Sequence, residues 1–217
     1  MGTYAVTGSA SGMGSAVTER LNVAGHSVID VDLHDAQINA DLATPEGRSA
    51  AAAAILERSG GVLQGAVFAA GIGPLPGPDR ALRIMQTNYL GTVELLTALR
   101  PALAAGGESR VVVFGSNSPT IMPHVPRPVF RAIRTGKIEQ AVRRVRIFGR
   151  AAPNFAYAAS KLAVTDWARR AAVTPAWAGA GIRLNVIAPG PVKTPLLVAL
   201  TTEPDALRVP FHSWARC

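Results

Sequence analysis

The stretch TGSASGMG, residues 7–14, decides the fold of this 217-residue chain. It follows a short apolar run, Tyr4–Thr7, and precedes a segment, Ser15–Ala24, whose apolar residues repeat on one helical face. Glycines permit a tight turn and let backbone N–H groups approach a pyrophosphate, which then lies at the positive end of the following helix. An ordinary turn also uses glycines in this way, so the stretch by itself does not assign a function.

Strand and helix patterns alternate along the rest of the chain. The expected strands are Ser27–Asp32, Gly65–Ala69, Arg110–Gly115 and Arg183–Ala188, and the expected helices are Pro45–Arg58, Leu82–Leu99 and Ala156–Ala172. Buried apolar strands joined by helices are typical of a parallel sheet covered on both faces. We therefore expect one α/β domain over residues 1–217, with a Rossmann-like, doubly wound parallel sheet.

The composition excludes several classes of protein. Hydrophobic residues make up 48% and charged residues 17% of the chain, which excludes a disordered chain. The longest apolar stretch, Ala50–Leu56, is too short to span a bilayer, and the start lacks the pattern of a signal peptide. The lone cysteine, Cys217, has no partner for an internal disulfide, and four scattered histidines make a metal site improbable. We expect a cytoplasmic protein with no metal and no membrane partner.

The positive charge of the chain is concentrated in one segment. Between Thr120 and Arg150, eight Lys and Arg residues stand against Glu139 alone, a net of +7 out of a total of +8. A local excess of this kind indicates a local feature rather than a basic domain. No aromatic residues interleave the arginines in the manner of a single-strand binding surface, so we expect no nucleic-acid partner.

An acidic residue follows the glycine-rich stretch at an informative distance. Asp32 ends the second expected strand, 20 residues after Gly12, where a carboxylate would accept hydrogen bonds from a ribose 2′-hydroxyl. The carboxylate would repel a 2′-phosphate, and Leu33 provides no cation for one, so the pattern favours NAD over NADP. Asp30 is the competing acid, but it lies in the middle of the strand.

Tyr157 and Lys161 are spaced to share one face of a helix. A free tyrosine has a pKa near ~10 and is a poor base at neutral pH. A neighbouring ammonium and an oxidised nicotinamide would both lower the pKa of Tyr157. This tyrosine–lysine spacing is common by chance, however, and taken alone is typical of a surface pair.

In combination, these features resemble the short-chain dehydrogenase/reductase family. The glycine stretch, Asp32, NYLG (residues 88–91), VVVFGS (111–116), YAASK (157–161) and NVIAPGPVKTP (185–195) occur in the family's order over residues 3–200. The resemblance is strongest to the NAD-dependent 3α-hydroxysteroid dehydrogenase/carbonyl reductase branch. It rests there on the AAG at residues 69–71, the ADLAT at 40–44, NYLG and a long insertion before Tyr157.

The resemblance implies roles for individual residues. Tyr157 would be the general acid/base, Ser116 would hydrogen-bond the same substrate oxygen, and Lys161 would bind the nicotinamide ribose. Asn88 would hold a water that continues a proton relay. The residues implied to bind NAD are Gly8, Ser9, Gly12, Met13, Gly14, Asp32, Asp41, Leu42, Gly71, Tyr157, Lys161 and Thr194. Ser118 is the alternative to Ser116 as the catalytic serine. The alternative for Asn88 is a purely structural role in a helix.

The chain departs from the family in an insertion at residues 119–152. Ser116 and Tyr157 are 41 positions apart, and the segments Pro128–Arg134 and Lys137–Phe148 read as two helices broken at Thr135-Gly136. Gly149 follows as a stop. One interpretation is a solvated helical excursion or a subunit contact. The other is a basic lid that attracts an anionic substrate, such as an acyl thioester or an acidic steroid.

A second departure concerns the end of the chain. Family members continue through a further helix and an edge strand, whereas this sequence passes Val209 and stops at Cys217, so we expect a truncated tail. The resemblance implies an NAD(H)-dependent oxidoreductase that interconverts a secondary alcohol and a ketone, with a hydroxysteroid or similar bulky apolar compound as substrate. It also implies a homodimer or homotetramer that pairs Leu82–Leu99 and Ala156–Ala172. The alternative is a truncated, catalytically silent nucleotide-binding or scaffolding protein.

Overall fold

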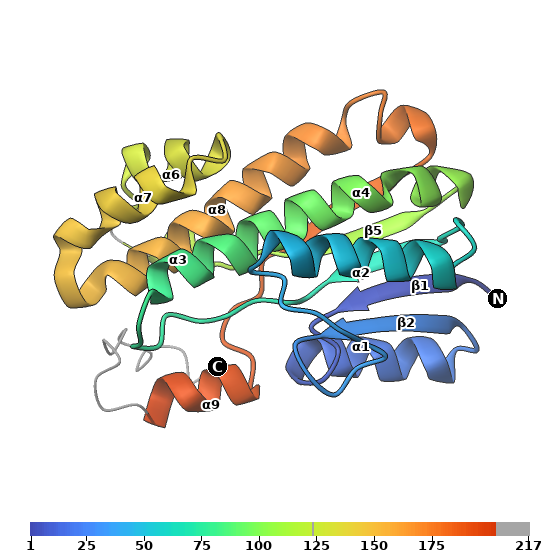
Figure 1. Ribbon diagram of the computed structural model, residues 1–217, viewed down its shortest axis with the longest axis horizontal. Helices are drawn as coiled ribbons and strands as arrows, with labels where there is room; N and C mark the ends of the chain where they lie inside the picture. Colours follow the sequence, from blue (N-terminus) through green and yellow to red (C-terminus); the bar gives the residue numbers. More distant parts are fainter. Residues whose placement is uncertain (123, 203–217) are drawn as a thin grey trace.

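The computed structural model describes residues 1–122 and 124–202 and contains one six-stranded parallel sheet (Figure 1). The strand order is β3-β2-β1-β4-β5-β6, and every neighbouring pair is parallel. The strands are β1 (Thr3–Thr7), β2 (Ser27–Asp32), β3 (Ile38–Asn39), β4 (Gly65–Phe68), β5 (Arg110–Phe114) and β6 (Arg183–Ile187). The expected Rossmann-like, doubly wound α/β fold is confirmed, and among the described strands the two-residue β3 is the one that was not predicted from the sequence.

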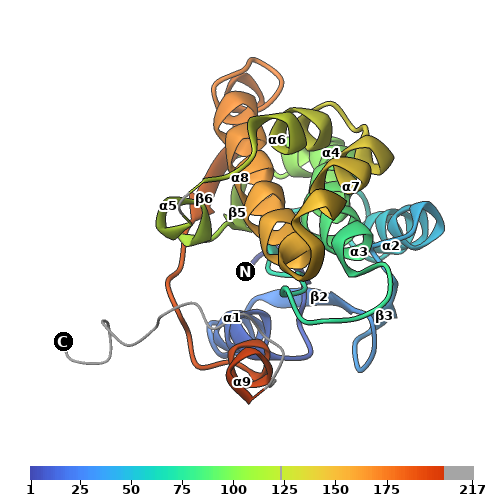
Figure 2. The same ribbon diagram turned by 90° about the vertical axis from the view of Figure 1, so that its left-hand side faces the viewer.

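Helices cover the two faces of the sheet. Figure 2 shows α1 (Gly12–Val23) and α9 (Pro195–Thr202) on one side, with α2 (Pro45–Arg58), α4 (Gly91–Ala105) and α8 (Ala152–Ala172) on the other. The core between the sheet and this second layer consists of aliphatic side chains, among them the fully buried Ile55, Leu96 and Val111. Helix α2 has the bounds expected from the sequence, because the Thr44 hydroxyl accepts a hydrogen bond from Gly47 N and Pro45 starts the first turn.

The glycine-rich turn converts β1 directly into α1. The helix begins at Gly12, three residues earlier than the pattern predicted, because Gly8 and Gly12 adopt the left-handed backbone conformation (φ +73° and +57°) that completes the turn. A Cβ atom at Gly8 would lie 2.6 Å from Ala70 N, and one at Gly14 would overlap Gly8 O. The turn is therefore compact enough to pack against the segment that follows β4.

The helix expected at Leu82–Leu99 is longer and contains an irregular turn. Helix α3 (Arg80–Met85) leads into a π-helical turn, η1 (Gln86–Leu90), and then into α4. The apolar pattern alone could not show this turn, because a π turn inserts one residue without breaking the buried face. The buried Asn88 lies in the middle of this turn, which packs on α8.

The insertion between β5 and α8 forms a helical layer on the outside of α8. It consists of α5 (Ser118–Ile121), α6 (Arg127–Arg134), α7 (Ile138–Val145) and the 3-10 turn η2 (Arg146–Ala151). The two predicted helices and their break are confirmed, although α7 ends three residues before Phe148 and η2 takes over. Helix α6 packs on α8, and α7 packs on α3 and α8.

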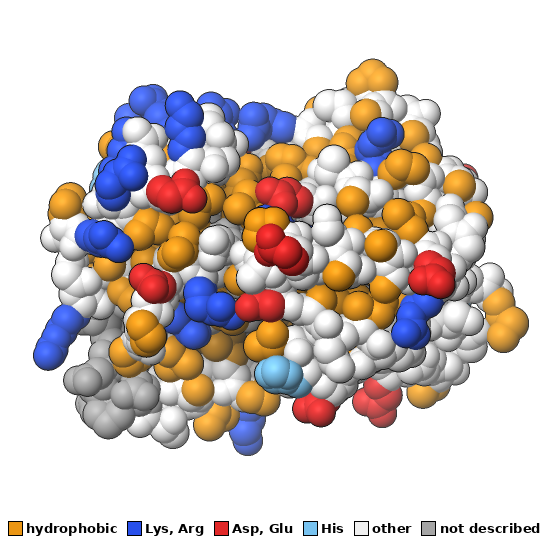
Figure 3. All heavy atoms as spheres, in the orientation of Figure 1, with side chains coloured by type: hydrophobic (Ala, Val, Ile, Leu, Met, Phe, Trp, Pro, Cys, Tyr) orange, Lys and Arg blue, Asp and Glu red, His pale blue; other side chains and the backbone are white. Residues whose placement is uncertain are grey.

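The charge of the insertion faces away from this packing. Figure 3 shows Lys and Arg side chains gathered over α6 and α7. The apolar side chains of both helices, including Val129, Ile133, Ile138 and Val145, are buried. The two faces explain how a segment with a net charge of +7 can pack against the core.

Part of the sequence interpretation lies outside the described residues. The tail expected to be truncated, Val209–Cys217, is in this group, so the structure does not test that expectation. Over residues 1–122 and 124–202, β6 is the last strand at its edge of the sheet. Helix α9 follows β6 through the segment that contains Thr194.

We propose that the insertion is an integral part of a single domain, which a matched pair of substitutions tests. Ile133 is 0% exposed and Ile147 is 81% exposed, both within the insertion. Ile133→Ala leaves a cavity and should lower the free energy of unfolding by about 2–4 kcal/mol. Ile147→Ala should change it by less than about 0.5 kcal/mol. Equal effects in urea denaturation would show that the insertion folds apart from the core.

Candidate active site

A cleft of about 240 Å³ lies at the carboxyl ends of the central strands. It is bounded by the glycine turn, the end of β2, the segment after β4, and the start of α9. Its lining includes Gly8, Gly12, Met13, Gly14, Asp32, Asp41, Leu42, Gly71 and Thr194, all of which the sequence analysis singled out. The carboxyl edge of a parallel sheet is where ligands bind in open α/β folds.

The glycine turn has one buried polar group that is not satisfied. Ser9 is buried, and its hydroxyl has no hydrogen-bond partner within the described part of the chain. A buried hydroxyl without a partner is costly, so such a group indicates a place for a ligand. The first residues of α1, Gly12, Met13 and Gly14, line the cleft, and a helix N-terminus attracts negative charge. This set of groups fits the pyrophosphate of a dinucleotide.

Asp32 lies beside the glycine turn and is held by two backbone amides. Its Oδ2 accepts from Ala10 N at 2.9 Å, and its Oδ1 accepts from Leu33 N at 2.6 Å. Asp30, the competing acid, accepts instead from Gln37 N at 3.4 Å and does not line the cleft. Asp32, at the end of β2, therefore lines the cleft, where its carboxylate can accept hydrogen bonds from ribose hydroxyls and would repel a phosphate.

Tyr157, in the second turn of α8, is close to Ser116 at the end of β5. Burial raises the pKa of Tyr157 above its ordinary value, and a hydrogen bond from the Ser116 side chain acts in the opposite direction. Ser118, the alternative serine, donates its N–H to Ser116 Oγ at 3.0 Å, and its own hydroxyl is buried without a partner among the described residues. The assignment of Ser116 rather than Ser118 as the catalytic serine stays a prediction. The expected lowering of the tyrosine pKa by Lys161 is wrong for this structure, because burial dominates.

Lys161 is almost completely buried, with 6% of its surface exposed. Its Nζ donates to the backbone oxygen of Phe114, the last residue of β5, at 2.8 Å. Burial lowers the pKa of Lys161 from its ordinary 10.5 to about 8. A buried ammonium is costly to maintain, which lowers its pKa, but a pKa of about 8 still leaves Lys161 mostly protonated at neutral pH.

Asn88 has its side chain fully engaged with the backbone. Its Oδ1 accepts from Ile72 N at 2.9 Å, and its Nδ2 donates to Ile72 O at 3.1 Å. Nδ2 also approaches Ser160 Oγ at 3.4 Å. A Cβ atom on Gly71 would lie 3.2 Å from Asn88 Oδ1 and 3.4 Å from Lys161 Nζ, so a larger residue would press on both side chains. The side chain therefore fixes the segment after β4 to α8, and a role in a proton relay stays a prediction.

The remaining predicted positions lie at the two ends of the cleft. Thr194 caps α9, since its hydroxyl accepts from Leu197 N at 3.3 Å, and it approaches Gly12. Asp41 and Leu42 lie at the opposite end, next to Arg83 and Thr87 of the α3–η1 segment. Arg83 was not predicted from the sequence, because no motif connects it to Asp41, from which it is separated by 42 positions.

The described part of the chain offers neither a cluster of metal ligands nor a membrane-spanning helix. Residues 1–122 and 124–202 contain no group of three or more His, Cys, Asp or Glu side chains that could hold a metal ion. None of the helices in this part of the chain is both long enough and apolar enough to cross a membrane.

Comparison with known proteins identifies the family. A family model described as enoyl-(acyl carrier protein) reductase matches residues 8–213. The 3-alpha-hydroxysteroid dehydrogenase/carbonyl reductase of Comamonas testosteroni is 37% identical over 94% of this chain and 78% of its own length. A coniferyl-alcohol dehydrogenase from Pseudomonas is 29% identical over 97% of this chain and 83% of its own length.

A solved structure agrees with these matches. The 3-alpha-hydroxysteroid dehydrogenase from Pseudomonas sp. B-0831, complexed with NADH, has a TM-score of 0.86 and 44% identity, covering 94% of this chain and 78% of that one. The chain therefore belongs to the short-chain dehydrogenase/reductase family. It is an oxidoreductase of this family, as the resemblance in its sequence implied.

The depressed pKa of Lys161 has a consequence for stability. Between pH 8 and pH 10.5 the unfolded chain binds more protons at this residue than the folded chain does, so its contribution to the free energy of unfolding rises with pH. The rise between pH 8 and about 9.5 should be about 1.5 kcal/mol. Lys161→Met should remove it, whereas Lys193→Met, at an exposed position, should not. Parallel stability–pH curves for wild type and Lys161→Met would contradict the assignment.

Proposed function

We propose that the protein interconverts a secondary alcohol and a ketone by hydride transfer with NAD(H). The observation that carries the proposal is the convergence of Ser116, Tyr157 and Lys161 at the carboxyl ends of the strands, next to the glycine-turn cleft. Family membership supports an oxidoreductase of this kind. The catalytic roles of these three residues and of Asn88 are part of the proposal.

The cofactor is NAD(H), and the residues of the cleft fit it. Gly8, Ser9, Gly12, Met13 and Gly14 would hold the pyrophosphate at the start of α1. The other residues proposed to hold the dinucleotide are Asp32, Asp41, Leu42, Gly71, Tyr157, Lys161 and Thr194. Asp32 would accept from ribose hydroxyls and exclude a 2′-phosphate. The bound nicotinamide supplies the site that accepts or donates the hydride.

The chain itself supplies the proton. Tyr157 is a neutral phenol near pH 7, because its ordinary pKa is already near ~10 and burial raises it, and this is the form that donates a proton to a developing alkoxide. The hydroxyl of Ser116 is close enough to share a hydrogen bond with the same oxygen. Lys161, held by Phe114 O, provides positive charge beneath the site and can donate to ribose hydroxyls. In the oxidation direction, Tyr157 must lose its proton, which its elevated pKa makes harder in the absence of further positive charge.

The substrate class rests on the relatives. The named activities of two of them concern 3α-hydroxysteroids, and we propose a hydroxysteroid or a similarly bulky apolar carbonyl compound for this chain. A homodimer or homotetramer is also proposed. Because α6 packs on α8 within the same chain, the covered part of α8 is not available for the subunit pairing expected from the sequence. The cytoplasmic location stays a prediction.

Replacement of Tyr157 separates the enzyme from a catalytically silent nucleotide-binding or scaffolding protein. Tyr157→Phe should lower kcat for steroid alcohols by about 10²-fold or more, because it removes the proton donor and little else. Turnover is measured by NADH absorbance. Tyr4→Phe is the matched control. Tyr4 lies in β1, where its ring packs edgewise on His26, so this variant should leave kcat unchanged. NAD binding without turnover by the wild-type chain on any alcohol would favour the silent protein.

The insertion supports a finer proposal about substrate charge. A groove of about 520 Å³ between α6 and α7 combines Arg143 and Arg144 with apolar side chains, among them Phe148. Phe148 stacks on Phe155, with ring centroids 4.0 Å apart, and Phe155 is two residues before Tyr157. We propose that this basic surface attracts anionic substrates, in preference to the alternative of a solvated excursion or subunit contact.

Neutralising the basic surface tests this proposal. A variant with Arg143, Arg144 and Arg146 changed to Gln should lower kcat/KM for an acidic steroid, relative to a neutral one, by about fivefold at low salt. The effect should disappear at high salt. The control changes Arg20, Arg110 and Arg169, exposed cations outside the insertion, to Gln. It therefore has the same net charge as the first variant. An unchanged ratio in the first variant would leave the solvated or subunit-contact interpretation.

A further inference from the structure

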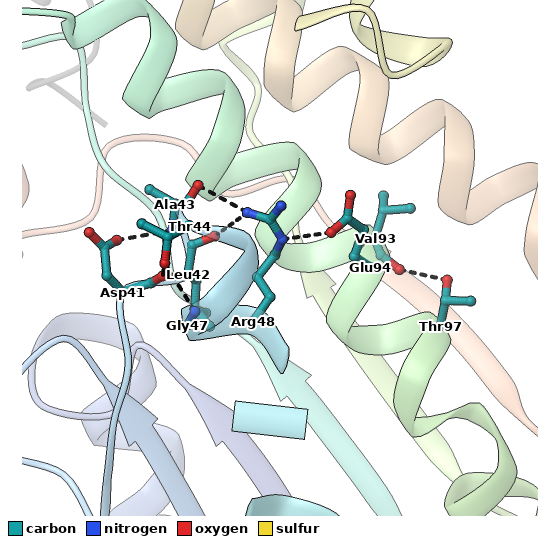
Figure 4. Close-up of polar contacts among 9 residues, drawn as sticks. All are labelled: Asp41, Leu42, Ala43, Thr44, Gly47, Arg48, Val93, Glu94 and Thr97. Carbon is teal, nitrogen blue, oxygen red and sulfur yellow. Dashed lines mark hydrogen bonds and ion pairs between the residues drawn. The ribbon is translucent and has the colours of Figure 1, made fainter. Parts of the chain in front are cut away.

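A buried arginine holds the segment that forms one end of the cleft. Arg48, in the first turns of α2, is only 6% exposed. Its Nη1 donates to Leu42 O at 3.1 Å and to Ala43 O at 3.0 Å, while its Nε donates to Glu94 Oε2 of α4 at 2.7 Å (Figure 4). One guanidinium thus connects two helices to the carbonyls of Leu42, which lines the cleft, and of its neighbour Ala43.

The surroundings leave this segment little freedom to move. Leu42 and Ala43 are both buried, and a Cβ atom on Gly91 would lie 3.1 Å from Leu42 Cβ. A Cβ atom on Gly47 would overlap Asp41 O. A buried guanidinium must keep its acceptors, because losing them leaves an uncompensated charge. Arg48 therefore fixes the backbone of the segment from the side opposite to the cleft.

A second arginine acts on the same segment from within the cleft. Arg83 Nη2 lies 3.1 Å from Asp41 Oδ2, and Asp41 Oδ1 accepts from Ala43 N at 3.0 Å. Both carboxylate oxygens are thereby oriented, yet each keeps a second lone pair. The pair is partly exposed, at 43% for Arg83 and 31% for Asp41, so it contributes little to stability. Its position on the cleft lining indicates a role in recognition instead.

We propose that Arg48 and Arg83 are positioning residues that preform the Asp41–Ala43 wall, so that the Asp41 carboxylate selects the adenine of the dinucleotide. Arg48 sets the backbone, and Arg83 sets the direction of the carboxylate. An oriented carboxylate accepts from the exocyclic amino group of adenine and repels the oxo group that hypoxanthine carries at the same position. This inference rests on the proposed function, in which Asp41 and Leu42 flank the adenine.

The decisive variant is Arg83→Met, which removes the donors from a partly exposed pair and keeps most of the apolar stem. Binding of NAD and of nicotinamide hypoxanthine dinucleotide is measured by calorimetry, in the absence of substrate. The preference of the wild type for NAD should fall about tenfold in the variant, chiefly through weaker NAD binding. The KM for NAD should rise by a similar factor, with kcat within twofold of the wild type. Arg170→Met, which removes an exposed pair with Asp166 on α8, should change none of these quantities.

Arg48→Met tests the other half of the proposal. The variant should show the same loss of preference in its folded fraction, in addition to lower thermal stability. An unchanged preference in Arg83→Met, with NAD bound as tightly as by the wild type, would overturn the inference and leave the proposed function intact. A wild-type chain that binds neither dinucleotide would overturn both.

Discussion

The approach of Gly8 to the backbone of Ala69 and Ala70 is the constraint on which the site depends. No side chain fits between the turn after β1 and the segment after β4, because a Cβ atom at Gly8 would lie within 2.8 Å of three backbone atoms. The contact keeps the carboxyl ends of two neighbouring strands together and starts α1 directly at the turn. The first residues of α1 and Gly71 consequently line one cleft.

Two buried cations fasten the helices to this edge of the sheet by the same physical means. Lys161 donates to Phe114 O, which attaches α8 to the end of β5, and Arg48 donates to Leu42 O and Ala43 O, which attaches α2 to the opposite end of the cleft. Carbonyl oxygens at strand ends and in loops have no partner within a sheet or helix, so they are suited to stabilise a buried positive charge. The position of each functional segment is thus linked to the core.

The basic insertion is built on a different balance. Helices α6 and α7 are each only eight residues long and would be unstable alone, so their buried aliphatic faces against α8 and α3 hold them in place. Because the apolar faces of α6 and α7 are buried, the arginines of these helices lie on the outer surface. The stacked pair of Phe148 and Phe155 joins this surface to the helix that carries Tyr157, which gives the insertion a physical connection to the site.

The resemblance to the family, rather than local patterns, implied most of the positions that were predicted to hold the cofactor and that line the cleft. Local sequence patterns alone determined the alternation of the main strands and helices, the parallel sheet, and the bounds of β2 and α2. Such features depend on periodicity, turn residues and caps, which act over a few neighbours. The π turn that contains Asn88 was not predictable, because it preserves the apolar face. The raised pKa of Tyr157 and the lowered pKa of Lys161 were decided by tertiary structure, since burial depends on residues distant in sequence. Arg48 and Arg83 belong to the same group: their partners are Glu94 and Asp41, and only the packing of α2, α3 and α4 brings them together.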